Sequence, residues 1–422
     1  MKKTPCNQSS STLRRLRRWS GPALVFCIVS VAWADPVPTF RFAVIGDHRG
    51  DNKAWDTNTW TRYTDDGITK PALREIASAL KTENVDFVLD VGDLATKWTK
   101  QLKNITPDVL FAGELADWAN LWQEHSGNLP IFPVRGNQEV SASVSVWQNF
   151  LKGMPGIGSL TPNGPAGEEW MTYSFTYRNC LFVGVDQYMP PGDNDTHYIT
   201  PGALEWVDQQ LDPRVNKLTR SGHKFVWGHA PAFEIWDFKA KTNFTTMKDG
   251  LASPFTSFSY DFKGINFVAM RDTFWDSVAK RKAEYFCGHD HIYARGVAVD
   301  SKGRWARQTI IGNGGAPPPI LPPAYPPAAY TLGPFAESYT GIPFATLPTD
   351  ILYQLESPRI IAESFPLFEI PPTPPKVTGL PYGYGYVVIE VAGPKVTAIY
   401  KAEPEVGAGF REVDRWTISA GE

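Results

Sequence analysis

Two histidines, His289 and His291, lie one residue apart directly after the apolar run 285–287. If that run is a strand, side chains two positions apart share a face, so both imidazoles would leave the sheet edge together. Neutral imidazoles beside a carboxylate bind borderline divalent metals. The alternative is a pair of solvated loop histidines, and the rest of the chain decides between the two readings.

Other polar side chains follow a glycine at the end of a strand-like run. With the two histidines they form one candidate metal-ligating set: Asp47, Asp93, Asn137, His229, His289 and His291. In α/β folds such groups collect at the carboxyl ends of strands, so we expect them to meet. A mixed nitrogen and oxygen set suits Mn, Zn or Fe, and it is large enough for one or two divalent or trivalent ions.

The elements that must position these groups alternate between strands and helices. We expect strands at 40–45, 85–91, 129–134, 172–177, 180–185, 224–227, 284–287, 296–299 and 308–311. We expect helices at 71–80, 115–122, 201–211 and 271–282. Residues 386–391 and 396–400 predict a β-hairpin, with 416–418 as a last edge strand. This alternation is the signature of an α/β layer fold.

The composition is that of a globular protein, with 422 residues of which 42% are hydrophobic and 20% are charged. The length fits one large domain or two smaller ones. A net charge of −3 gives no indication of an extended nucleic-acid surface. The chain contains no Gly-x-Ser-x-Gly, which argues against a serine hydrolase.

Residues 1–34 have the features of a secretory signal peptide. A cluster of arginines at 14–18 precedes an apolar stretch at 21–32, which is too short to span a bilayer comfortably. Ala32-Trp33-Ala34 matches the small-x-small cleavage pattern. We expect cleavage before Asp35, no membrane span afterwards, and a secreted or periplasmic protein. The alternative is an N-terminal anchor that is not cleaved.

Cleavage would leave only Cys180 and Cys287 in the mature chain. Two cysteines cannot define a disulfide framework, and both lie in apolar runs. We expect buried free thiols rather than a bridge.

The composition changes in residues 316–375, which hold 16 of the 36 prolines. Proline removes a backbone donor and fixes φ, so we expect no sheet and no long helix in this interval. Its apolar residues predict a loop packed on the surface.

Taken together, Gly92-Asp93, Gly136-Asn137, His229 and the Gly288–His291 stretch occur in the order seen in one known family. The chain resembles the calcineurin-like metallophosphoesterase superfamily, which includes the purple acid phosphatases. The resemblance implies a four-layer α/β/β/α sandwich in which metal-bound hydroxide attacks phosphate mono- or diesters. It divides the chain into a metallophosphoesterase domain at 35–315, a proline-rich insertion at 316–375 and C-terminal strands at 376–422 that complete the domain.

The same resemblance gives each ligand a place. Asp93 would bridge two ions. Asn137, His229 and His289 would complete one ion site, and Asp47 and His291 would belong to the other.

The sequence departs from the family pattern at two positions. Arg49 stands where the first motif has a histidine ligand, and a guanidinium cannot ligate a metal. Water or the adjacent His48 could fill that gap, and Arg49 could clamp a phosphate oxygen. Gln138 stands where a histidine resembles a general acid, and glutamine cannot shuttle a proton. Thr96 replaces the tyrosine of purple acid phosphatases, so we do not expect their colour.

Two functions are consistent with these residues. The first is an exported metal-dependent hydrolase that acts on a phosphate-ester small molecule or a phosphorylated substrate, with Asn137, Gln138 and Arg49 at the reacting group. The second is a metal-binding protein that keeps the fold but has little turnover and acts as a binding module. The Arg49 and Gln138 replacements favour this second reading. Trp98, Trp236 and Tyr293 are candidates for lining the substrate cleft.

Overall fold

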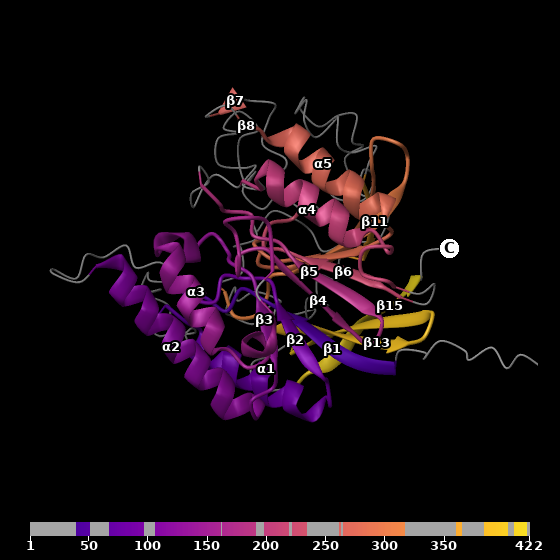
Figure 1. The fold of residues 1–422 in the computed structure, drawn as a ribbon. Coiled ribbons are helices and arrows are strands. Elements are labelled where there is room, and N and C mark those ends of the chain that lie inside the picture. Colours follow the sequence, from indigo (N-terminus) through magenta and orange to yellow (C-terminus); the bar gives the residue numbers. More distant parts are fainter. Residues whose placement is uncertain are drawn as a thin grey trace, which may run out of the picture. The chain divides into compact units, whose positions relative to one another are not determined.

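The computed structural model describes part of the chain after the predicted signal segment. The described residues are 39–50, 67–96, 106–161, 163–190, 198–218, 222–233, 261–262, 265–316, 360–364, 384–403 and 409–419. Residues 1–34, most of the proline-rich interval, and the cleft candidates Trp98 and Trp236 lie outside them. The described part places two β-sheets between two layers of helices (Figure 1).

The first sheet has the strand order β15-β14-β13-β1-β2-β3. Its strands are β1 (Thr39–Ile45), β2 (Phe87–Asp90), β3 (Ile131–Pro133), β13 (Gly385–Ala392), β14 (Lys395–Ala402) and β15 (Arg411–Ser419). Strands β1, β2 and β3 are parallel, so their carboxyl ends meet at one edge. The predicted C-terminal hairpin forms as β13 and β14, and β13 pairs antiparallel with β1.

The second sheet has the order β12-β10-β11-β9-β6-β5-β4. Its strands are β4 (Tyr173–Tyr177), β5 (Cys180–Gly184), β6 (Lys224–Trp227), β9 (Glu284–Cys287), β10 (Tyr293–Val299), β11 (Trp305–Ile311) and β12 (Ile360–Ser364). Strands β5, β6, β9 and β11 are parallel to their neighbours in this series. A separate small sheet pairs β7 (Asp261–Phe262) with β8 (Ile265–Asn266).

Strand β12 corrects the expectation that the proline-rich interval contains no sheet. It lies inside residues 316–375 and pairs antiparallel with β10. The short run from Ile360 to Ser364 contains no proline, so every residue in it can donate to a ladder. It takes the edge position of the second sheet.

The two sheets pack face to face through phenylalanine side chains. Phe42 on β1 contacts Phe182 on β5 and Phe225 on β6, with ring centroids 5.2 and 5.0 Å apart. Phe87 on β2 contacts Phe182 at 5.1 Å. These rings are buried, and edge-to-face pairs of this kind add to the stabilisation from apolar burial. The four-layer sandwich predicted from the sequence is confirmed.

Helices cover the outer face of each sheet. Helices α1 (Lys70–Thr82), α2 (Pro107–Ser126) and α3 (Val144–Gly153) accompany the first sheet, and α4 (Pro201–Leu211) and α5 (Phe267–Lys280) accompany the second (Figure 1). The hydroxyls of Thr106 and Thr200 cap α2 and α4 by accepting from backbone N–H groups. A proline follows each capping threonine at the first helical position, where no N–H is needed.

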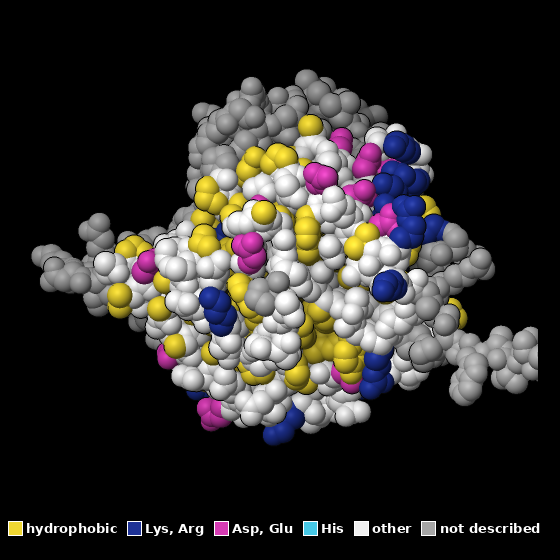
Figure 2. Space-filling model, in the orientation of Figure 1, with side chains coloured by type: hydrophobic (Ala, Val, Ile, Leu, Met, Phe, Trp, Pro, Cys, Tyr) yellow, Lys and Arg dark blue, Asp and Glu magenta, His cyan; other side chains and the backbone are white. Residues whose placement is uncertain are grey.

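Charged side chains join the outer helices α4 and α5. Lys280 Nζ lies 3.2 Å from Asp208, and Arg281 Nη2 lies 3.2 Å from Asp212. Figure 2 shows basic and acidic side chains gathered together near these helices. Among the residues that the structure describes, no helix has the length and apolar character to cross a bilayer. Cys180 and Cys287 are buried free thiols, as predicted.

Candidate metal centre

The predicted ligands come from both sheets. Asp47, Asp93 and Asn137 follow β1, β2 and β3 of the first sheet. The three histidines follow β6 and β9 of the second. Hydrogen bonds and ion pairs link all of them into one cluster, which we divide into two overlapping halves. Subsite 1 is formed by Asp47, Asp93 and His291, and subsite 2 by Asp93, Asn137, His229 and His289.

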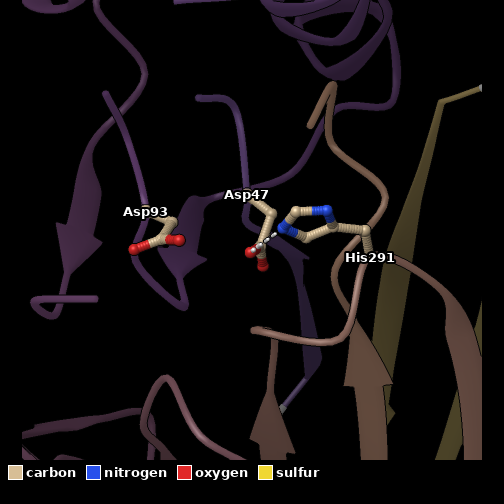
Figure 3. Close-up of side chains that lie close together, drawn as sticks. All are labelled: Asp47, Asp93 and His291. Carbon is tan, nitrogen blue, oxygen red and sulfur yellow. Dashed lines mark ion pairs between the residues drawn. The ribbon is translucent and has the colours of Figure 1, made fainter. Parts of the chain in front are cut away.

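Subsite 1 brings two carboxylates and an imidazole together at the junction of the sheets. One ligand atom from each of Asp47, Asp93 and His291 lies within 4.8 Å of the others. His291 Nε2 is 3.6 Å from Asp47 Oδ1 (Figure 3). Within the described residues, the buried Asp47 Oδ1 accepts no hydrogen bond. A buried carboxylate oxygen in that state fits a cation.

The carboxylates of subsite 1 disfavour each other's charge. Burial and the neighbouring Asp93 raise the pKa of Asp47 well above its ordinary value, while the Arg49 guanidinium opposes this shift. Burial also raises the pKa of Asp93, again against the effect of Arg49. A bound divalent cation would reverse the balance by favouring both ionised forms.

Subsite 2 is arranged around the neutral imidazole of His229. Its Nδ1 lies 2.9 Å from the Val91 carbonyl, which can only accept, so Nδ1 carries the proton and Nε2 presents a lone pair. That Nε2 faces Asn137 Oδ1 at 3.2 Å, Asp93 Oδ1 at 3.5 Å and His289 Nδ1 at 3.2 Å. Burial lowers the pKa of His229 to about 3, so the ring stays neutral.

Three of the ligands adopt left-handed backbone conformations. The φ angles are 59° at Asp47, 56° at Asp93 and 69° at His289, and each residue directly follows a glycine. Residues other than glycine rarely adopt such angles, and they concentrate at functional sites. The turn after each strand therefore aims its side chain at the junction of the sheets.

Two glycines permit the close approach of these turns. A Cβ at Gly288 would overlap the Asp47 carboxylate, and a Cβ at Gly136 would overlap the carboxylate of Asp93. The small residue in each motif is thus required by the neighbouring ligand.

Glu139 holds the turns after β2 and β3 together, a role that the sequence reasoning did not assign. Its carboxylate accepts N–H groups from Asp93, Leu94, Ala95 and Gly136 at distances between 2.6 and 3.3 Å. Burial and the Asp93 carboxylate raise the pKa of Glu139 to about 8, while these N–H donors act in the opposite direction. The sequence feature that could have indicated this role is the carboxylate two residues after Asn137, in a turn that is buried.

Arg135 makes a second connection, between the two sheets, that the sequence did not reveal. Its guanidinium pairs with Asp186, with Nη2 at 2.7 Å and Nε at 2.8 Å, and both side chains are buried. Asp186 follows β5, and Arg135 directly precedes the Gly136-Asn137 turn. A paired, hydrogen-bonded geometry is what a buried charge requires.

His48 does not fill the gap in subsite 1. Its Nδ1 lies 2.9 Å from the Gly314 carbonyl, and its Nε2 lies 3.3 Å from Asp90 Oδ2. Both side chains are fully buried. Asp90 in turn accepts from the Gly92 backbone at 2.9 Å, so His48 supports the turn that carries Asp93.

The two replaced motif residues both contact Asp93. Arg49 Nε is 3.2 Å from Asp93 Oδ2, and Arg49 Nη2 is 3.2 Å from His291 Nε2. The backbone N–H of Gln138 donates to Asp93 Oδ1 at 3.0 Å. Arg49 therefore lies against subsite 1, where the family pattern has a histidine ligand.

Tyr293 belongs to the core and not to a substrate cleft. Its ring stacks on Tyr400 with centroids 3.7 Å apart, and its hydroxyl donates to Asp414 at 2.8 Å. The cleft role predicted for Tyr293 is thus wrong, because β10 directs this side chain into the junction with β14.

Thr96 stands where purple acid phosphatases have a tyrosine. Its hydroxyl donates to the Gly50 carbonyl.

Residues 40–304 match the calcineurin-like phosphoesterase family, which is more than half of the chain. The chain belongs to this family and is therefore a metal-dependent hydrolase of phosphate esters. The resemblance inferred from the strand-end motifs is confirmed at the level of the family.

The chain is distantly similar to several solved structures. The chain is similar to a dimetal phosphatase from Danio rerio, with 13% identity, a TM-score of 0.47, and coverage of 92% of this chain and 100% of that one. It is similar to PhoD at 15% identity and a TM-score of 0.49, covering 91% and 70% of the two chains. Similarity at this level supports no inference about activity. A comparison with curated proteins gave no match.

Proposed function

We propose that the chain is an exported phosphoesterase that hydrolyses phosphate mono- or diesters at subsites 1 and 2, using Mn, Zn or Fe. The observation that supports this best is the convergence in subsite 2. The His229 Nε2 lone pair faces oxygens of Asn137 and Asp93 at 3.2 and 3.5 Å. Acceptor atoms held face to face at these distances repel unless a cation or a proton lies between them, and a divalent cation can contact all three atoms at once.

The residues fit a metal, and each has a definite part in holding it. Asp93, Asn137, His229 and His289 would supply oxygen and nitrogen ligands in subsite 2. Asp47, Asp93 and His291 form the adjoining group of oxygen and nitrogen atoms in subsite 1. A divalent ion held there would lower the pKa of water and stabilise charge that develops on phosphoryl oxygens. Asp93 directs Oδ1 toward His229 and Oδ2 toward Arg49, so its carboxylate faces both subsites.

Arg49 is placed to orient the substrate. Its side chain is 22% exposed, and its contacts with Asp93 and His291 use Nε and Nη2. The Nη1 group can then donate to a phosphate oxygen, since the guanidinium fork matches phosphate geometry. Gln138 offers an amide and no transferable proton, so the leaving group departs without a side-chain acid from that position.

The proposal is tested by hydrolysis of p-nitrophenyl phosphate and bis(p-nitrophenyl) phosphate. Protein stripped with chelator should release little p-nitrophenol, and added Mn²⁺ or Zn²⁺ should restore release from at least one ester. A binding module would take up metal without releasing product. Hydrolysis that changes neither with chelator nor with added metal would mean that the activity does not come from the metal centre.

Export is supported by the arginine cluster, the apolar stretch and the Ala32-Trp33-Ala34 pattern in residues 1–34. We expect the mature protein to begin at Asp35. N-terminal sequencing of the protein recovered outside the cytoplasm checks this, and an intact Met1 in that fraction would contradict it.

A further inference from the structure

We propose that the Arg49 guanidinium takes the place of one metal ion, so that the protein binds a single divalent ion, in subsite 2. The inference rests on the proposed function, because it concerns how the same cluster holds its metal. It departs from the two-ion arrangement that the sequence resemblance implies.

Arg49 and a metal in subsite 1 would compete for the same two atoms. Arg49 Nη2 lies 3.2 Å from His291 Nε2, and a guanidinium nitrogen can only donate, so Nε2 must accept. The same Nε2 atom lies 3.6 Å from Asp47 Oδ1, so its lone pair is the one that a metal in subsite 1 would use. Arg49 Nε lies 3.2 Å from Asp93 Oδ2. An ion in subsite 1 would have to displace the guanidinium from both ligands.

The backbone of Arg49 is fixed on several sides. Its N–H donates to the Asp93 carbonyl at 3.0 Å. Its carbonyl accepts the Thr69 hydroxyl at 3.1 Å, and Arg49 forms an isolated antiparallel bridge with Ile68. The side chain therefore starts from a fixed point beside Asp93, which reduces the conformational entropy lost when the guanidinium packs into subsite 1.

Subsite 2 is compatible with Arg49 in this position. It uses the other oxygen of Asp93, Oδ1, which faces His229 Nε2 at 3.5 Å. Asn137 Oδ1 and His289 Nδ1 complete the set around the same nitrogen, each at 3.2 Å. A metal bound there leaves the contacts of Arg49 with Asp93 Oδ2 and His291 undisturbed.

The net charge of the cluster is also compatible with one ion. Asp47 and Asp93 carry two negative charges, of which Arg49 offsets one at any physiological pH. A single divalent ion then leaves the cluster with a net positive charge that can receive a phosphate. The guanidinium supplies charge and hydrogen bonds to the phosphate, but it cannot lower the pKa of water as a metal does.

The test counts bound ions in purified protein equilibrated with Mn²⁺ and then freed of excess metal. Elemental analysis should give one ion per chain for the wild type, with the electron paramagnetic resonance signal of an isolated Mn²⁺. Arg49→His restores an imidazole at the family position and should hold two ions, with a spin-coupled signal. Arg49→Lys keeps a positive charge at the position and should remain at one.

A wild type that holds two coupled ions and hydrolyses aryl phosphates would overturn this inference and leave the proposed function intact. A wild type with neither metal nor hydrolysis would contradict both. Arg49→Ala provides a second variant if Arg49→His does not fold, since it only removes the competing side chain. It should also admit a second ion, held by Asp47, Asp93 and His291, and a variant that stays at one ion would overturn the inference.

Discussion

His229 and His48 show how contacts give two buried imidazoles different roles. His229 donates from Nδ1 to the Val91 carbonyl and presents Nε2 to the ligands around it. His48 uses one nitrogen on the Gly314 carbonyl and directs the other to Asp90. The first imidazole is available to a metal, and the second supports the turn that carries Asp93.

Gln138 should limit the enzyme to substrates with good leaving groups. A positioned acid contributes about 10²–10⁴-fold, and its absence matters most when the leaving group is a poor one. Gln138→His should therefore raise kcat/KM for alkyl phosphate esters far more than for aryl esters. The measurement is the ratio of the two values in wild type and variant at equal metal content. An unchanged ratio would mean that this position is not a vacated acid site.

Glu139 should act on stability and not as a replacement acid. Its two oxygens already accept four backbone N–H groups, from Asp93, Leu94, Ala95 and Gly136. In Glu139→Gln one oxygen becomes an NH₂ group that faces backbone donors, which should lower the free energy of unfolding by about 1–3 kcal/mol. Urea unfolding of the two proteins above about pH 8, where Glu139 is ionised, measures this. If stability is unchanged while alkyl-ester turnover collapses, Glu139 is the missing acid.

Spacing in the sequence was sufficient to predict which side chains meet. Each candidate ligand except His291 directly follows a glycine at a strand end, and parallel strands bring such ends together. The orientation of His48 could not be predicted, because it depends on its contacts with Gly314 and Asp90. Both residues are distant from His48 in the sequence. The contacts of Arg49 were missed for a similar reason, since they require both sheets to be in place.

At the level of elements, the side chains at the strand ends can converge only because the turns after the strands fit against each other. Gly288, after β9, lies against Asp47, after β1. Gly92 has a φ of 99°, and a Cβ there would lie 2.6 Å from Gly136 N. These turns place backbone where any side chain would collide with a neighbouring strand end.

Gly288→Ala should therefore disrupt the site while the sheets remain. The new methyl group would meet the Asp47 carboxylate, so metal affinity and thermal stability should both fall. Gly113→Ala is the matched control, because Gly113 lies in α2 with nothing within 4 Å of its Cβ position. The control should gain up to about 1 kcal/mol of stability. Isothermal titration with Mn²⁺ and thermal unfolding measure both effects. Equal metal affinity in the two variants would contradict the packing described here.

Most strands and four helices were predictable from apolar periodicity and from proline at helix starts. Helix α3 was not predicted, because valines at 144 and 146 weaken the helical signal in a short segment. Strand β12 was missed because its pairing with β10 is a long-range contact that local composition does not reveal.

On the scale of the whole molecule, the candidate metal centre forms only when the two sheets are packed together. The first sheet contributes Asp47, Asp93 and Asn137, and the second contributes the three histidines. A ligand that binds only the folded state stabilises it, so metal binding and folding should be coupled.

This coupling should depend on pH. Burial raises the pKa of Asp47 and Asp93, and with the Asp93 carboxylate it raises that of Glu139 to about 8. Above about pH 7, the folded chain still holds carboxyl protons that the unfolded chain has lost. Stability of the chelated protein should thus fall between about pH 7 and 8.5, and less so with metal bound.

Urea midpoints at the two ends of that range, with and without Mn²⁺, provide the measurement. Chelated protein that becomes more stable as the pH rises would contradict the raised carboxyl pKa values. An equal loss of stability with and without metal would mean that the carboxyl groups that titrate in this range do not belong to the metal centre.

The most direct test is to remove Asp93, the one carboxylate that faces both subsites. Asp93→Ala and wild type are compared for bound Mn²⁺ and for kcat/KM with p-nitrophenyl phosphate in the same samples. Asp117→Ala, an exposed position on α2, is the control. We predict that Asp93→Ala loses its metal and at least about 100-fold in activity, since even outer partners of a metal site are worth 10–100-fold. Full metal content and unchanged turnover in Asp93→Ala would show that the strand-end cluster is not the catalytic centre.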